Sequence, residues 1–150
     1  MKHGGTVFSV SSDYTGERIV SGCRDGIIRV IRVPTGLIER TIEINSPIYG
    51  VAFELAGTRF AVAAKEVLRI VDAESGEIQH TFQIGSVVHS TTFDTSGLLI
   101  AAGVLAPAAK LVDSRSRAAV RRLDILRDHL RVFRLPKWNS EHYGTNPKRG

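Results

Sequence analysis

The sequence predicts an all-β protein that contains three antiparallel sheets of four strands each. Two observations carry this prediction: the chain repeats itself about every forty residues, and within each repeat apolar and polar residues alternate in short runs. Alternation with a period of two is typical of strands buried on one face, whereas an amphipathic helix has a period near 3.6. Gly, Asp, Ser and Pro bound these runs, as expected for tight turns between strands.

The repeat is visible in both its segments and its spacing. The segment VSSDYTGERIVSG is echoed by VAFELAGTRFAVAA and then by TTFDTSGLLIAAG. The three glycines of these segments, Gly16, Gly57 and Gly97, are 41 and 40 residues apart. A Thr-Gly pair at 35 and 36 also recurs 40 residues later as Ser75-Gly76. Such a period indicates a chain built from three copies of one supersecondary unit.

We expect four strands in each unit, separated by turns. In the first unit the expected strands are Val7–Ser11, Arg18–Ser21, Ile27–Val33 and Leu37–Ile44. In the second unit they are Ile48–Phe53, Arg59–Ala64, Val67–Asp72 and Glu77–Ile84. In the third unit they are Val87–Phe93, Leu98–Gly103, Lys110–Asp113 and Ala118–Leu123.

The pair Asp25-Gly26 lies between the second and third expected strands of the first unit. We expect this pair to supply the positive φ angles of a two-residue hairpin turn. The run that follows is apolar on both faces, which is typical of a strand covered by neighbouring sheets. Pro34-Thr35-Gly36 then ends the strand, because proline lacks a backbone donor and glycine turns freely.

Composition indicates an ordinary folded domain. Of the 150 residues, 43% are hydrophobic and 23% are charged, which argues against a disordered chain. Cys23 is the only cysteine and no Asn-x-Ser/Thr occurs, so nothing indicates a secreted, disulfide-stabilised fold. No signal peptide is evident, and no apolar segment reaches the roughly 20 residues of a membrane span. We expect an intracellular protein, in the cytoplasm or the nucleus, that does not bind membranes.

The net charge of +5 is distributed unevenly along the chain. Residues 1–114 carry 10 basic and 12 acidic side chains, whereas residues 115–150 carry 10 and 3. This uneven charge indicates that the tail binds a partner, and it carries no information about the fold. We therefore divide the chain into a β region at 1–123 and a basic tail at 124–150.

These features together resemble the WD-repeat family of β-propellers. Repeats of that family typically run Ser-Gly-Ser-x-Asp-Gly, then an Ile-Arg-Val-Trp-Asp strand and a Thr-Gly turn, and residues 21–36 are SGCRDGIIRVIRVPTG. The resemblance covers residues 3–123 and is strongest in the first unit. It implies three propeller-like blades, a partial β-propeller, followed by the short basic tail.

The resemblance also implies a structural hydrogen-bonded network formed by His3, Ser21 and Asp25. The match is partial, because Ile31 stands where the family has Trp and Arg32 stands where an Asp would follow. The second and third units have Lys-Glu and Val-Leu-Ala-Pro-Ala-Ala in place of the turn Asp-Gly. We expect these positions to have a structural role only.

Three blades cannot close a propeller, because such rings contain four to eight. The open ends would expose strand edges and apolar surface, and leaving a few hundred Å² uncovered forgoes on the order of 10 kcal/mol. We therefore expect a cover, either a partner protein or a second copy of the chain, since two copies supply six blades. A chain that is a fragment of a longer propeller is a further interpretation.

Residues 124–135 leave two interpretations open. RDHLRVFRLPKW resembles RDGIIRVIRVP with one residue deleted, as if a vestigial fourth unit had kept its third strand. The alternative is a helix with one apolar face, formed by Val120, Leu123, Leu126, Leu130 and Phe133. We favour a strand as far as Leu123. The residues beyond Pro136 are polar and turn-rich, which is typical of a loose terminus.

The sequence carries no catalytic signature. It has no GxSxG, P-loop, GxGxxG or HExxH pattern, and its five histidines lack the spacing of metal ligands. We expect no enzymatic activity, no metal, no cofactor and no small-molecule substrate. Cys23, beside Arg24, is expected to be an inert thiol that is buried or half-buried.

The sequence favours a non-catalytic protein–protein interaction scaffold, as the resemblance implies. The candidate partner-binding residues lie in turns and in the basic tail: Arg24, Lys65, Val104, Leu105, Pro107, Arg121, Arg122 and Arg131. The alternative is a nucleic-acid-binding protein whose tail arginines contact phosphates. A solvated outer face is the simpler account of those arginines.

Overall fold

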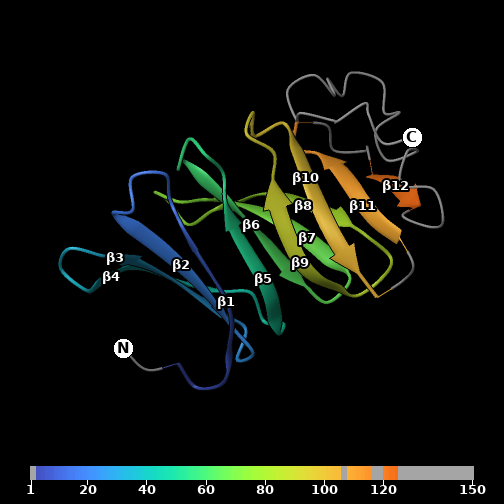
Figure 1. The fold of residues 1–150 in the computed structure, drawn as a ribbon. Helices are drawn as coiled ribbons and strands as arrows, with labels where there is room; N and C mark the ends of the chain where they lie inside the picture. The colour runs from blue at the N-terminus through green and yellow to red at the C-terminus, as the bar shows by residue number, and fades with distance from the viewer. Residues whose placement is uncertain (1–2, 106–107, 116–119, 125–150) are drawn as a thin grey trace, which may run out of the picture.

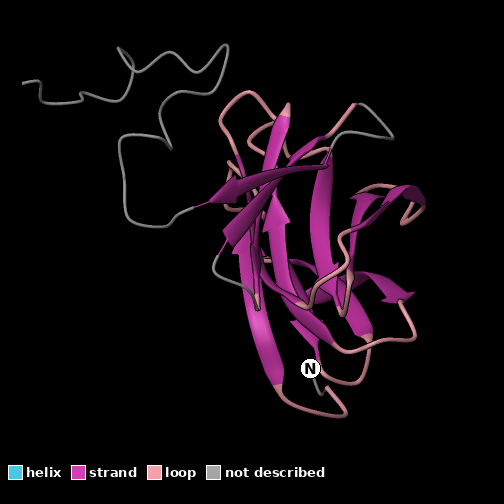
Figure 2. Cartoon of the chain, turned by 90° about the vertical axis from the view of Figure 1, so that its right-hand side faces the viewer, coloured by secondary structure: helices cyan, strands magenta, loops and turns pink. Residues whose placement is uncertain are grey.

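The computed structural model describes residues 3–105, 108–115 and 120–124. In this part of the chain all regular secondary structure is β-strand (Figure 2). No helix that is long and apolar enough to cross a bilayer occurs among these residues.

The strands form three separate antiparallel sheets, which we call blades 1, 2 and 3. Blade 1 consists of β1 (Val7–Ser12), β2 (Arg18–Cys23), β3 (Ile27–Arg32) and β4 (Leu37–Glu43). Blade 2 consists of β5 (Ile48–Phe53), β6 (Arg59–Ala64), β7 (Val67–Asp72) and β8 (Ile78–Gln83). Blade 3 consists of β9 (Val88–Phe93), β10 (Leu99–Val104), β11 (Ala108–Asp113) and β12 (Val120–Asp124). Within each blade the strands lie in the order of the sequence.

The three blades stand side by side in a row (Figure 1). Their first strands, β1, β5 and β9, are neighbours, and the later strands of each blade extend away from this line. The predicted all-β fold with three four-stranded sheets is confirmed, and every strand bound lies within two residues of its predicted position. The tail interpretations fall on residues 125–150, outside the described residues.

The turn after the first strand of each blade shows why the repeat is visible in the sequence. Gly16, Gly57 and Gly97 have φ angles of +72°, +73° and +73°, a region that side chains disfavour. Each glycine donates its N–H to the carbonyl three residues earlier, at 3.0–3.2 Å. Glycine therefore recurs at this point because the same turn is built three times.

The predicted turn at Asp25-Gly26 is wrong in its detail. Only Gly26 has a positive φ, +81°, and the connection comprises the three residues between Cys23 and Ile27. Gly26 donates its N–H to the carbonyl of Cys23 at 3.1 Å. The Asp25 side chain accepts a hydrogen bond from the N–H of Ile27 at 2.9 Å. This loop needs one left-handed residue rather than two, because it is one residue longer than predicted.

Each blade has two faces, which we name by their neighbours. The forward face looks toward the next blade along the chain, and the rear face looks toward the previous one. Residues opposite each other in neighbouring strands share a face. The forward face of blade 1 carries Val20, Gly22, Ile28 and Val30, and the rear face of blade 2 carries Val51, Phe53, Phe60, Val62 and Val71. These two faces form one buried core, and blades 2 and 3 form a second in the same way.

Hydrogen bonds from blade 1 also hold the first strand of blade 2. The hydroxyl of Ser9 accepts a bond from the N–H of Val51 at 3.1 Å, and that of Ser11 accepts one from Phe53 at 3.0 Å. Both serines lie opposite residues of the forward face of β2. The inner edge of the junction is therefore fixed by directional bonds in addition to apolar contact.

Arginine side chains form a second set of hydrogen bonds between neighbouring blades. Arg18 donates to the carbonyl of Gly57 at 3.3 Å, and Arg59 donates to that of Gly97 at 2.9 Å. Both begin the second strand of their blade, and both reach the first turn of the next blade. Arg59 is held in place by the buried carboxylate of Glu54, whose Oε2 lies 2.6 Å from the Arg59 Nε.

We expect Gly22→Ala to destabilise the first junction by about 1–3 kcal/mol, the usual cost of overpacking. A Cβ atom at this position would lie 2.5 Å from Ile48 Cγ2 and 2.9 Å from Val51 Cγ1. Urea denaturation followed by circular dichroism measures the change. Gly5→Ala is the control, because its Cβ would meet nothing closer than 3.6 Å. Equal stability losses in both variants would refute the close approach of the blades.

We expect Glu54→Gln to lower the free energy of unfolding by about 2 kcal/mol. Removing one partner of a buried ion pair costs about 3–5 kcal/mol, and the loss here is smaller because the Arg59 side chain is 21% exposed. Glu39→Gln breaks the exposed pair with Arg32 and should cost less than about 1 kcal/mol. The same denaturation experiment compares them. A Glu39 variant as unstable as the Glu54 variant would contradict this account.

Candidate functional site

Two blade faces in the described part of the chain have no neighbouring sheet: the rear face of blade 1 and the forward face of blade 3. They lie at the two ends of the row of blades (Figure 1). Every other face is buried in one of the two cores. Blades 1 and 3 therefore each have one face without a neighbouring sheet, whereas both faces of blade 2 are covered.

The free rear face of blade 1 is apolar at several positions. Strand register places Val10, Ile19, Ile31 and Ile38 on this face. Val10 is 58% exposed and Ile38 is 44% exposed. The equivalent positions of blade 2 include Val51, which is buried against blade 1. The exposure of Val10 therefore reflects the lack of a neighbouring sheet, whereas Ile31 on the same face is only 6% exposed and Ile38 is as exposed as its counterpart Ile78 in blade 2.

The free forward face of blade 3 is formed by small and aliphatic residues. Strand register assigns to it Ala101, Gly103, Ala109 and Leu111, with Ser90 and Thr92 on the first strand. Ser90 and Thr92 are exposed. These residues, and Val10 and Ile38, were not predicted from the sequence. Alternation along each strand is the signal that separates the two faces.

A second candidate surface lies at one end of the blades, where the second and third strands connect. Three of the predicted partner-binding residues, Arg24, Lys65 and Leu105, occupy this same turn in blades 1, 2 and 3 and are exposed. Leu105 is 71% exposed. Val104 must be removed from the predicted surface, because its side chain is 6% exposed and packs in the second core.

The other predicted partner-binding residues lie at the end of the chain. Arg121 and Arg122 are on β12, where their backbones pair with Leu111 and Lys110. Pro107 and Arg131 lie outside the described residues. A role of these four in binding stays a prediction.

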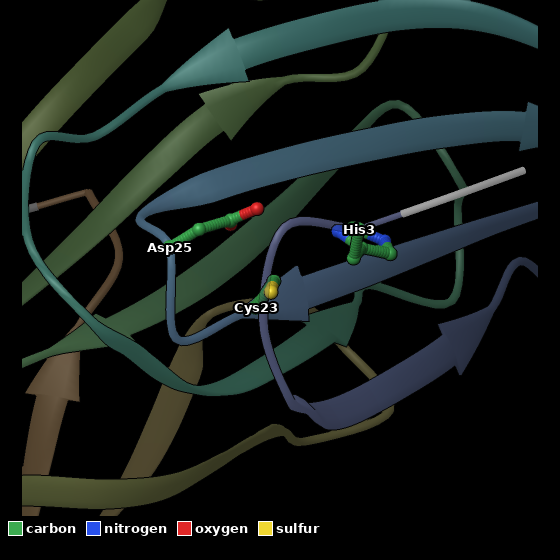
Figure 3. A group of neighbouring side chains, drawn as sticks. All are labelled: His3, Cys23 and Asp25. Atoms are coloured by element: carbon green, nitrogen blue, oxygen red, sulfur yellow. The ribbon is translucent and has the colours of Figure 1, made fainter.

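Two of the predicted network residues, His3 and Asp25, lie close together beside Cys23 at the end of β2 (Figure 3). His3 Nε2 is 2.8 Å from the hydroxyl of Ser21. Asp25 does not bond to either of them directly. Its carboxylate instead accepts the N–H of Gly4 at 2.9 Å, which holds the segment that carries His3. The predicted set is therefore connected through the backbone.

Arg29 is a member of this cluster that the sequence analysis missed. Its guanidinium contacts Nδ1 of His3. Burial lowers the pKa of His3 below its ordinary value, and the positive charge of Arg29 lowers the pKa further. The negative charge of Asp25 acts in the opposite direction, but the net shift lowers the pKa of His3 and favours the neutral imidazole.

The Asp25 carboxyl is held in its charged form. Partial burial acts to raise its pKa, but hydrogen bonds from the Cys23 thiol and from the N–H groups of Ile27 and Gly4 outweigh this effect. The net result is that the pKa of Asp25 lies below its ordinary value.

His3, Cys23 and Asp25 also offer a nitrogen, a sulfur and an oxygen within 4.8 Å of one another. Such a donor set suits zinc in principle. The groups are already occupied, however, since Ser21 and the backbone bond to His3 and Asp25. A divalent cation would also lie close to the guanidinium of Arg29. The arrangement favours a hydrogen-bonded network over a metal site.

Comparison with known proteins agrees with this architecture. None of the family models and none of the curated proteins matches the sequence. Among solved structures, the β-propeller domain of Myceliophteria thermophila Cps50 (Swd1) is similar, with a TM-score of 0.73 and 17% sequence identity. The match covers 81% of this chain and 38% of that domain's chain, so this chain spans less than half of its length. The three sheets therefore have the fold of consecutive blades of a β-propeller.

Proposed function

We propose that this chain is a non-catalytic interaction module that binds other polypeptides through its two free blade faces and the turns at one end of its blades. The observation that carries this proposal is the exposed apolar rear face of blade 1. Val10 is 58% exposed, whereas its counterpart in blade 2, Val51, is buried; Ile38 is exposed on the same face, as is its counterpart Ile78. Apolar side chains exposed on a sheet face without a neighbouring sheet favour an interaction site.

A polar hollow among the described residues supports a non-catalytic role. It lies between the outer strands of blade 1 and the outer turn of blade 2, and its lining includes Glu17, Arg18, Arg32, Glu39 and Glu74. Their charges pair with each other at 3.3–3.8 Å. Paired surface charges of this kind explain the hollow without a reaction.

We expect the Val10→Asp, Ile38→Asp double variant to lose protein partners that the unmodified chain retains. A charge on this face would have to be desolvated on binding, which is costly without a counter-charge. Both variants are immobilised and the proteins they retain from a cell extract are quantified by mass spectrometry. The control is Leu55→Asp, which alters a turn residue that is 53% exposed and outside both free faces.

The outcome separates a specific surface from general stickiness. Retention that depends on Val10 and Ile38 but not on Leu55 supports the proposal. If the unmodified chain retains no polypeptide, including itself, beyond what the double variant retains, the proposed function is wrong. Circular dichroism of each variant shows whether the sheets are intact.

The charge of the tail favours a second candidate function, binding of nucleic acid. Residues 115–150 carry 10 basic and 3 acidic side chains, while the remainder of the chain is slightly acidic. Lysines and arginines that neutralise phosphates release counterions, which makes such binding strongly dependent on salt.

We expect the triple variant Arg127→Ser, Arg131→Ser, Arg134→Ser to bind RNA or DNA more weakly. The slope of log K against log salt concentration should fall by the amount expected for the loss of about three phosphate contacts. Fluorescence anisotropy with a labelled oligonucleotide across a salt series measures both. The matched control removes three arginines of blade 1: Arg24, Arg32 and Arg40. Equal losses in the two triple variants would indicate a response to net charge, and the tail would not be a nucleic-acid site.

A further inference from the structure

We propose that two copies of this chain close a six-bladed ring, in which the forward face of blade 3 of each copy packs on the rear face of blade 1 of the other. This inference rests on the proposed function and names the occupant of its free faces. Strand register fixes which positions are equivalent in the three blades, and this equivalence supports the arrangement.

The forward face of blade 3 is built like the two forward faces that are buried. In blade 1 the pairs Val20–Val30 and Gly22–Ile28 form this face, and in blade 2 the pairs Ala61–Ile70 and Ala63–Leu68 take their places. In blade 3 the same register positions hold Ala101–Leu111 and Gly103–Ala109. All are aliphatic or glycine. Blade 3 therefore has the same residue types on this face as the two faces that pack against a sheet; of these residues Leu111 is already buried, and Ala101, Gly103 and Ala109 are half-buried.

Blade 3 also repeats the hydroxyl groups that hold the next blade. Ser9 and Ser11 lie opposite Gly22 and Val20, and they bond the N–H groups of the first strand of blade 2. Ser90 and Thr92 lie opposite Gly103 and Ala101 in the same register. Blade 2 has Gly50 and Ala52 at these two positions. The exposed hydroxyls of blade 3 are thus placed to bond the first strand of a further blade.

The rear face of blade 1 supplies the complementary surface. The pair Ile19–Ile31 is equivalent to Phe60–Val71, which is buried in the first core. Val10 is opposite Ser21 as Val51 is opposite Val62. The N–H groups of Val10 and Ser12 are therefore the counterparts of those that Ser9 and Ser11 bond in blade 2.

The segment that carries His3 already occupies the place of a linker between blades. In blade 2, Arg69 donates to the carbonyl of Ile44, and in blade 3, Lys110 donates to that of Ile84. Both carbonyls belong to the chain that enters from the previous blade. Arg29 is the equivalent cation of blade 1, and it contacts His3. A blade of a second copy can therefore pack here through its sheet alone. The segment that carries His3 already lies where the linker from a previous blade would lie.

Geometry favours a second copy as the occupant. Each of the three blades has four strands from contiguous sequence, so no blade lacks a strand that a partner must donate. One chain carries both surfaces of the same kind of junction. Two identical junctions related by a twofold axis form a closed assembly, and six blades fall within the four to eight of known rings.

One feature makes the closing junction weaker than the internal ones. Arg18 and Arg59 bond the first turn of the next blade, but the same register position in blade 3 is Leu99. The closing junction lacks this bond to the carbonyl of Gly16. Association is therefore expected to be reversible and dependent on concentration.

Sedimentation velocity of the full chain tests the proposal, with a dimer of twice 16.4 kDa as the expected species at high concentration. Val10→Asp and Thr92→Glu each change one face and should raise the dissociation constant at least about tenfold. Thr95→Glu is the control, because Thr95 is an exposed turn residue outside both faces. Leu99→Arg should lower the dissociation constant about twenty-five-fold, because it restores one hydrogen bond of about 1 kcal/mol at each of the two junctions.

Mixing the variants tests the head-to-tail geometry. Val10→Asp leaves the forward face of blade 3 intact, and Thr92→Glu leaves the rear face of blade 1 intact. A mixture should therefore form mixed dimers through one intact junction, while each variant alone stays monomeric. Native mass spectrometry distinguishes mixed dimers from monomers of each variant. A mixture that associates no more than its separate components refutes the head-to-tail arrangement.

The result also separates this inference from the proposed function. A chain that is monomeric at all concentrations, or whose association ignores both Val10→Asp and Thr92→Glu, overturns the six-bladed ring. If such a chain still retains other proteins through Val10 and Ile38, the interaction function stands and the partner is a different polypeptide. If it retains none, both proposals fail.

Discussion

The structure depends on how closely neighbouring sheets can approach. Opposing sheets pack face to face at roughly 10 Å, so the residues at the centre of each junction must be small on one side and large on the other. Gly22 meets this requirement in the first junction, where Ile48 and Val51 of blade 2 occupy the space above it. The serine and arginine bonds at the two sides of the junction then fix the relative position of sheets that apolar contact alone would leave free to slide.

The strands were predictable because their signals are local. Alternation and turn residues locate a strand from a few neighbouring positions, and the repeat supplies three independent examples of each. The turn at Asp25-Gly26 was predicted less well, since a difference of one residue in loop length changes which positions need a positive φ. The predicted proximity of His3, Ser21 and Asp25 came from the family pattern and not from local signals.

The free faces were predicted as a consequence of having three blades, but their residues were not. Alternation shows that a strand has two different faces and does not show which neighbour each face meets. That assignment depends on register and on the order of the blades in space, as the buried Val104 beside the exposed Leu105 shows. The role of Arg29 was hidden for a similar reason, because its partner His3 is 26 residues away and lies on a segment outside the strands.

The contiguity of each blade has a consequence for how the protein folds. Every sheet is a meander of successive strands, so most pairing joins residues that are close in sequence and carries a small entropic cost of loop closure. Stability then accumulates from blade to blade as in other repeat proteins, and blade 2, which is covered on both sides, gains the most from its neighbours. Partial unfolding should consequently start from the outer sheets and move inward, leaving the central meander as the last ordered unit.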